Sequence, residues 1–123
     1  MSTITHAFPG SRGAAIDYLQ KEFGGNLDFN NFDLVVDLAL VQVLPFNPER
    51  IMFTLMNLGP TVITVSPDQR TSALHGLRLG PNGGFLSFNV RDDGIIPTLE
   101  WTAVGDLAGG SLYVLNTFRD VLS

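Results

Sequence analysis

Residues 50–65 read RIMFTLMNLGPTVITV, two short apolar stretches separated by a turn. In Arg50–Asn57, the side chains alternate between two faces, which is the period of a β-strand. Leu58-Gly59-Pro60 is turn sequence, and Thr61–Val65 carries the β-branched residues that strands favour. This stretch therefore predicts two strands that pair as a hairpin.

The same succession of strand-like stretches and turns continues on both sides of residues 50–65. Glycine, proline and asparagine separate the stretches, and no helical period occurs between them. This spacing predicts a mainly β fold: an antiparallel β-sandwich or small barrel of about seven short strands, with neighbours in sequence paired as hairpins. The further predicted strands are Leu34–Leu44, Gly76–Leu79, Phe85–Arg91, Thr98–Val104 and Ser111–Phe118.

Residues 1–33 differ from the rest of the chain. Met1–Gly10 is predicted to be an extended arm, Ser11–Phe23 one short helix that ends at Gly24-Gly25, and Asn26–Asp33 a polar connector. The chain thus divides into residues 1–33 and a sandwich domain of residues 34–123. Because a single helix of this length is marginal alone, it needs a surface to lie on. The apolar residues expected to contact a partner are Ile4, Phe8, Ile16, Leu19 and Phe23.

The composition argues against several classes of function. Charged residues make up 15% of the 123 residues, against about 25% in an average domain. The net charge is −5, with no basic stripe, so we expect binding neither to nucleic acid nor to an anionic membrane. The absence of cysteine excludes a disulfide scaffold and a thiol nucleophile. We expect no signal peptide, since Met1–Gly10 lacks a basic start and an apolar stretch.

No group of residues has the spacing of a catalytic or metal site. The two histidines, His6 and His75, have no ligand spacing to other residues and are interpreted as polar loop residues. Asp92-Asp93-Gly94 is a turn sequence too short for a calcium loop. Asp37 and Glu100 are the acids within predicted strands, and they would be the centre of a small enzyme if a histidine lay beside them.

Two further features have an ordinary structural interpretation. Gly80–Gly84 precedes a strand and not a helix, and no Lys-Ser or Lys-Thr follows it, so it does not form a phosphate-binding loop. Trp101 and Tyr113 could form a platform for a sugar, but packing in the core or an interface is the default for such residues. A carbohydrate-binding module built on these two rings remains an alternative.

The chain between Asn47 and Leu115 resembles the small β-rich virion proteins of tailed bacteriophages that decorate or cement capsids or sit in head and tail appendages. The motifs that carry the resemblance are turns and strand ends. They are Asn47-Pro48-Glu49-Arg50, Asn57-Leu58-Gly59, Val62–Val65, Gly76-Leu77-Arg78-Leu79, Asn82-Gly83-Gly84, Pro97 with Glu100-Trp101-Thr102-Ala103, and Ser111-Leu112-Tyr113-Val114-Leu115. Residues 1–44 lie outside the resemblance.

The resemblance implies a structural role on the surface of a capsid, without enzymatic activity, metal or cofactor. It implies a symmetric oligomer, such as a homotrimer, whose partners are the major capsid protein and further copies of itself. The location would be the virion, after synthesis in the host cytoplasm. The alternative function is a module of a head or tail appendage that binds carbohydrate or the host surface.

Overall fold

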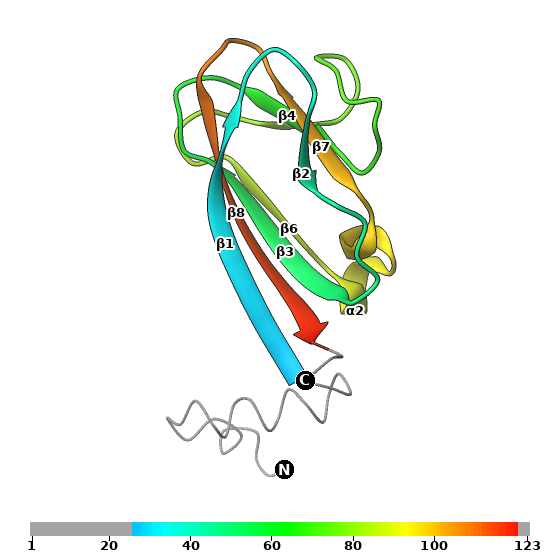
Figure 1. Ribbon diagram of the computed structural model, residues 1–123. Helices are drawn as coiled ribbons and strands as arrows, with labels where there is room; N and C mark the ends of the chain where they lie inside the picture. The colour runs from blue at the N-terminus through cyan, green and yellow to red at the C-terminus, as the bar shows by residue number, and fades with distance from the viewer. Residues whose placement is uncertain (1–25, 121–123) are drawn as a thin grey trace.

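A computed structural model describes residues 26–120, which form a β-sandwich of two antiparallel four-stranded sheets (Figure 1). The predicted fold class is therefore confirmed, as a sandwich. The elements in chain order are β1 (Asn26–Val36), β2 (Val41–Leu44), β3 (Arg50–Asn57), β4 (Ile63–Ser66), β5 (Leu77–Leu79), β6 (Phe85–Asn89), α2 (Val90–Asp93), a 3-10 turn η2 (Ile96–Thr98), β7 (Trp101–Gly105) and β8 (Gly110–Asp120). The predicted arm and helix lie outside the described residues.

Strands that are distant in sequence form both sheets. The first sheet has the order β1-β8-β3-β6, and the second has the order β2-β7-β4-β5. The longest pairing joins β1 to β8, from Asn26 opposite Asp120 to Val36 opposite Gly110, without a shift in register. Because β1 and β8 come from opposite ends of the described chain, this pairing joins the two ends of that chain at one edge of the first sheet.

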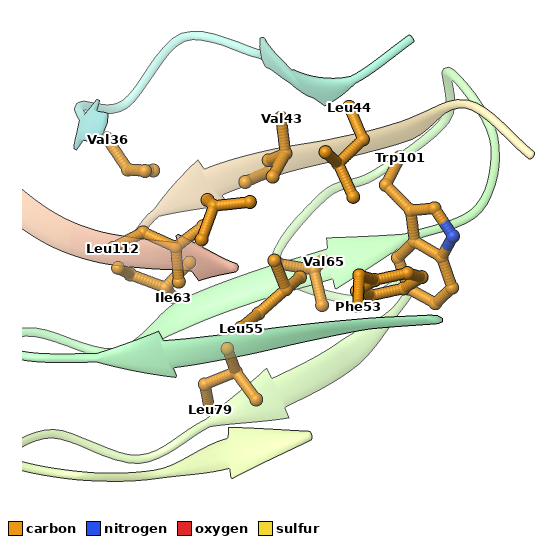
Figure 2. Packing of buried hydrophobic residues seen from close by; sticks show 12 residues of the cluster. Val36, Val43, Leu44, Phe53, Leu55, Ile63, Val65, Leu79, Trp101 and Leu112 are labelled. Carbon is orange, nitrogen blue, oxygen red and sulfur yellow. The ribbon is translucent and has the colours of Figure 1, made fainter. Parts of the chain in front are cut away.

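Alternate residues of the strands fill the space between the sheets (Figure 2). Phe53, Phe88 and Trp101 pack together at one end with ring centroids 5.1 to 5.8 Å apart, Phe53 and Trp101 edge to face and the other two pairs tilted. Each fully buried aliphatic or aromatic side chain contributes about 1.5–3 kcal/mol to folding. The buried hydrophobic cluster comprises Val36, Val43, Leu44, Phe53, Leu55, Ile63, Val65, Leu79, Trp101, Ala103, Leu112 and Val114.

The short segment of α2 and η2 connects β6 of the first sheet to β7 of the second. Asn89 caps α2, since its side-chain oxygen accepts a hydrogen bond from the Asp92 amide at 2.9 Å. Pro97 is buried in η2, and Ile96 packs against the core. This segment therefore covers the aromatic end of the core.

Arg50 is a buried cation at the same end of the sandwich, with 2% of its surface exposed. Its guanidinium donates to the carbonyl oxygens of Pro45 at 2.9 Å, Pro97 at 3.2 Å and Leu99 at 3.4 Å, and to the Asn116 side chain at 3.4 Å. Desolvation by burial lowers the pKa of Arg50 to about 10, so the group stays protonated at neutral pH. Arg50 thus joins β3 and β8 to the segment before β7.

The prediction of one strand over Leu34–Leu44 is wrong. β1 ends at Val36, and the chain crosses to the second sheet before β2 begins at Val41. Two glycines permit this close crossing: a Cβ on Gly110 would lie 2.9 Å from the Val36 carbonyl oxygen, and one on Gly105 would lie 3.1 Å from it. Of the apolar residues in this run, Val36, Val43 and Leu44 enter the core, whereas Leu38 and Leu40, between the two strands, are exposed.

The predicted polar connector at Asn26–Asp33 is also wrong. These residues belong to β1 and pair with β8 throughout, so β1 continues across the boundary predicted after residue 33. They are polar because the second sheet does not cover this part of β1, where only Leu27 is even partly buried.

The predicted pairing of neighbouring strands as hairpins holds only for β4 and β5. β3 pairs with β6 and β8, whereas β4 pairs with β5 and β7 in the other sheet. The turn at Leu58-Gly59-Pro60 therefore carries the chain between the sheets. The buried Asn57 side chain holds this turn, because it donates to the Thr61 carbonyl oxygen at 2.6 Å and accepts from the Gly59 amide at 3.0 Å.

The remaining differences concern the ends of elements. The predicted strand Phe85–Arg91 ends at Asn89, and Asp92 and Asp93 lie in α2, not in an isolated turn. Pro97 lies in η2, so the strand that was expected from Thr98 begins at Trp101. Asn89 explains the first difference, because its capping hydrogen bonds favour a helical turn over another strand residue.

Candidate interaction surface

All five predicted contact residues lie outside the described part of the chain: Ile4, Phe8, Ile16, Leu19 and Phe23. Their role in binding a partner stays a prediction. The surface described below is built instead from β1 and the strands beside it.

Among residues 26–120, the predicted acidic candidates do not meet the histidine described there, His75, whereas His6 lies outside the described residues. The Asp37 side chain is exposed and accepts a hydrogen bond from the Gly109 amide at 2.7 Å, so it holds the turn before β8. Glu100 accepts from the side chains of Gln42 at 2.6 Å and Gln69 at 2.8 Å, which lower its pKa. Both carboxylates therefore have local structural partners.

His75 lies beside a different carboxylate, that of Asp68. Nε2 of His75 is 3.0 Å from Oδ2 of Asp68, and the Arg70 guanidinium is 3.3 Å from the same oxygen. The other oxygen, Oδ1, accepts from the Ser66 hydroxyl at 2.7 Å and the Arg70 amide at 2.9 Å. The serine thus donates to the aspartate and not to the histidine. The hydrogen bond from serine to histidine that activates a serine nucleophile is therefore not formed here.

These contacts hold the loop of residues 67–76 over the second sheet. The Thr71 hydroxyl lies 2.6 Å from that of Ser66 and 2.7 Å from that of Thr102, and the Thr102 hydroxyl donates to the Asp68 carbonyl oxygen. Ser66 and Thr102 are buried as a result. The loop covers polar side chains on the outer face of that sheet, and this structural role accounts for the Asp68 cluster.

Replacing Asp68 by alanine should loosen this loop. Hydrogen bonds from Ser66 above all, with those from Arg70 and His75, hold the pKa of Asp68 well below its ordinary value. A carboxylate whose pKa is lowered on folding stabilises the fold above its unfolded pKa of about 4, and this contribution is lost as the pH falls toward the folded pKa. At pH 7, we expect amide hydrogen exchange at residues 70–75 to accelerate several-fold in the variant.

Asp33→Ala is the matched control, because Asp33 is an exposed carboxylate on β1. It should leave exchange in the loop unchanged. The loss of loop protection at acid pH should be seen in the wild type and be smaller in Asp68→Ala. Equal loop exchange in Asp68→Ala and the wild type at pH 7 would contradict the assigned role.

The two-ring platform for a carbohydrate is not formed. Trp101 is 1% exposed, and its indole N–H donates to the Ile96 carbonyl oxygen at 3.2 Å. Tyr113 is half-buried on the other side of the first sheet, facing away from the core. The prediction that these rings share a surface is therefore wrong, whereas the default interpretation of Trp101 as a core residue is confirmed.

The uncovered surface of the sandwich lies on the first sheet. We call it the outer face: it consists of the residues that alternate with the core residues along the four strands. Phe29, Val35 and Phe85 on this face are 53%, 66% and 65% exposed. Its charged residues are Asp33 and, at the far end of β8, Arg119. The face comprises Leu27, Phe29, Asn31, Asp33 and Val35 of β1, Ser111, Tyr113, Leu115, Thr117 and Arg119 of β8, Met52, Thr54 and Met56 of β3, and Phe85, Ser87 and Asn89 of β6.

β1 also has an open edge. Within residues 26–120, β8 is its only neighbouring strand, so every second backbone N–H and C=O along β1 points away from the sheet. Figure 1 shows β1 and β8 running side by side along this edge of the sandwich. The sequence could have indicated this strand, since Leu27 and Phe29 alternate with Asp28 and Asn30.

No group of three or more histidine, aspartate or glutamate side chains among residues 26–120 could hold a metal ion. None of the helices in that range has the length and apolar character needed to cross a membrane.

Comparisons with known proteins give a distant structural likeness. No family model matches the chain, and no curated protein matches it. One similar solved structure is described as "Bacillus endospore appendages form a novel family of disulfide-linked pili". The two chains are 18% identical with a TM-score of 0.43, and the match covers 76% of this chain and 86% of that one. A likeness at this level assigns the chain to no family.

Proposed function

We propose that this protein is a non-catalytic structural protein of a tailed-phage virion. In this proposal it binds the exterior of the capsid as an oligomer, such as a homotrimer, and stabilises the head. Its partners are the major capsid protein and further copies of itself. The observation that carries the proposal is the open edge of β1.

This edge lacks the features that normally prevent a strand from pairing with another chain. Soluble proteins protect exposed edges with lysine, proline, a bulge or a very short strand. β1 is 11 residues long, pairs with β8 without a bulge, and contains neither proline nor a basic residue. Its charges are two carboxylates, Asp28 and Asp33. An edge of this kind favours the addition of a strand from a partner.

The composition and the sequence resemblance support the same proposal. A chain with 15% charged residues has a surface suited to permanent burial against other subunits, since the centres of interfaces are depleted in charge. The exposed apolar side chains beside the edge, Phe29 and Val35, would add contact area to a joined strand. The resemblance to capsid decoration proteins supplies the kind of partner.

The test is to image purified particles of the phage that encodes the protein, with the wild type and with an edge-blocked variant. Asn31→Lys with Val35→Lys places two cations on β1, which should disfavour the approach of another strand. We expect occupancy on the shell to fall about tenfold or more, the effect of about 1.4 kcal/mol of lost binding free energy. Occupancy is measured from the density of the bound copies and from their mass ratio to the shell protein.

Leu74→Lys with Leu107→Lys is the matched control. It adds the same charge at two exposed residues in loops away from β1 and should leave occupancy unchanged. The single tryptophan is buried, so its emission reports whether each variant is folded. The absence of wild-type copies from both the shell and its appendages would overturn the proposal.

A further inference from the structure

The sandwich leaves one of its four sheet faces uncovered by residues 26–120. The two inner faces pack on each other around the core. The loop of residues 67–76 lies on the second sheet, where it buries Thr64, Ser66 and Thr102. No described segment lies over the outer face of the first sheet, where Phe29, Val35 and Phe85 are exposed. This face is therefore the apolar sheet surface that residues 26–120 leave exposed to solvent.

The apolar residues of the outer face are arranged in rows across the strands. Tyr113 lies between Met56 and Asp33, and Phe85 lies beyond Met56. Leu115 lies beside Thr54 in the next row. Successive rows on one face are two residues apart along a strand, or about 6.6 Å.

The third row, nearest the start of β1, contains Phe29, Thr117 and Met52. Since Phe29 and Met52 are exposed, this row also presents apolar surface to solvent. The three rows together form an apolar strip that runs along β8 and β3.

We propose that the segment Ser11–Phe23 of the same chain covers this strip as an amphipathic helix. The segment is the one helical pattern in the sequence, and its apolar residues Ile16, Leu19 and Phe23 lie on one face of a helix. A helix of 13 residues is about 20 Å long, enough to span the three rows, which lie about 13 Å apart from first to last. The inference concerns a contact within one chain and does not depend on the proposed capsid role.

The spacing of the three apolar residues matches the spacing of the rows. With a rise of about 1.5 Å per residue, Leu19 lies about 6 Å from Phe23, and Ile16 lies about 10.5 Å from Phe23. If Phe23 lies over the row of Met52, then Leu19 falls near the row of Leu115 and Ile16 falls toward the row of Tyr113. Each apolar residue of the helix thus lies over a row that contains an apolar side chain: Met52, Leu115 or Tyr113.

The point at which the segment joins the sheet permits this contact. Residues 24 and 25 are both glycine, and β1 begins at Asn26. Phe23 and Phe29 are each three residues from Asn26, a span of about 10 Å in either direction, so Phe23 can fold back to the row of Phe29. A connection this short gives the helix a high effective concentration at its own sheet, which favours its own chain over a second copy.

The other side of β1 is a poorer place for the helix. Asn26, Asp28 and Asn30 alternate there, and the Asn116 side chain on β8 donates a hydrogen bond to the Asn30 side chain. Burying these polar groups beneath Leu19 and Phe23 would cost free energy, because an apolar helix face offers them no partner. On the outer face the cost is smaller, because Asp33 is the one charged residue in the three rows and Arg119 lies beyond them. Thr54 and Ser87 on that face are already hydrogen-bonded to each other.

With the helix in place, the sandwich has two covered outer faces, and the edge of β1 is the part of the first sheet left for a partner.

The test uses the full chain and the absence of native cysteine. Leu19→Cys is combined with Leu115→Cys, and the pair is treated with a short bismaleimide. We expect crosslinking within one chain about tenfold faster than in the control pair, because the effective concentration of the two thiols is high. Leu19→Cys with Arg78→Cys is the control, since Arg78 is exposed on the outer side of the second sheet.

Peptide mapping identifies the crosslinked residues, and gel mobility separates crosslinks within a chain from those between chains. Crosslinks mainly between chains would overturn the inference and assign the face to a second copy. Equal rates in the two pairs would overturn it as well. A second readout is the oxidation of Met56 by peroxide, which should be several-fold slower in the wild type than in Leu19→Asp. Equal oxidation rates of Met56 in these two proteins would also overturn the inference.

Discussion

The Arg50→Ala variant is expected to lose about 3–5 kcal/mol of its free energy of unfolding, because several buried polar groups lose their hydrogen-bond donor. Arg50 donates to three carbonyl oxygens, and none of its acceptors is a carboxylate. Removing the guanidinium leaves the carbonyl oxygens of Pro45, Pro97 and Leu99 without this donor. A buried polar group that loses its partner costs about 1–3 kcal/mol.

The hydrogen bonds to these acceptors determine whether burial of the Arg50 guanidinium stabilises or destabilises the fold. Burial lowers the pKa of Arg50 to about 10, so the protein environment disfavours the cation relative to water. The hydrogen bonds must offset this penalty, and they can do so because the planar guanidinium donates in several directions at once. Arg50→Lys keeps the charge and offers fewer directions, so we expect it to recover only part of the loss.

Urea unfolding followed by Trp101 emission measures these differences. Arg50→Met is the informative comparison, because it keeps the apolar part of the side chain and removes every donor. We expect Arg50→Met to be destabilised nearly as much as Arg50→Ala. A methionine variant as stable as the wild type would mean that desolvation of the guanidinium cancels its hydrogen bonds, which would contradict the assigned role.

The existence of most strands follows from the sequence because alternation along a strand is a local property. β3 occupies Arg50–Asn57, the range predicted from its alternating side chains. The strand predicted over Gly76–Leu79 begins one residue later, at Leu77, because Gly76 has a φ of 138°. In both cases, residues close in the sequence determine where the strand begins and ends.

The pairing of the strands could not be predicted in the same way. Leu58-Gly59-Pro60 marks a turn, but turn residues do not specify which sheet the chain enters next. The destination depends on Asn57, whose side chain donates to the carbonyl oxygens of Thr61 and Leu79. These contacts join residues on both sides of the crossing, and they exist only after the sheets have packed.

The open edge of β1 could not be predicted from the sequence for a related reason. Asn26–Asp33 contains three asparagines and two aspartates, which are uncommon in strands and common in loops. The segment is a strand because β8 supplies its hydrogen bonds along the full length. A polar strand at an edge looks like a loop in sequence, so the candidate surface required the pairing with a strand about 90 residues away.

The Trp101→Ala variant should lose about 3–5 kcal/mol, the usual cost of truncating a large buried aromatic residue. Trp101 contacts Phe53 and Phe88, with ring centroids 5.1 and 5.3 Å away. Alanine would leave a cavity beneath η2 and release the Ile96 carbonyl oxygen from the indole N–H. Since domains are stable by about 5–15 kcal/mol in total, the variant should be largely unfolded at modest urea concentrations.

Trp101→Phe separates the two contributions, because phenylalanine keeps a ring between Phe53 and Phe88 but has no N–H for Ile96. We expect a loss of about 1–3 kcal/mol for this variant, from the unpaired carbonyl oxygen and the smaller volume. Far-UV circular dichroism replaces tryptophan emission as the measure of unfolding. If alanine and phenylalanine cost the same, the stability at this position comes from the N–H and not from the ring, and Trp101 would then be a hydrogen-bonding residue that happens to lie in the core.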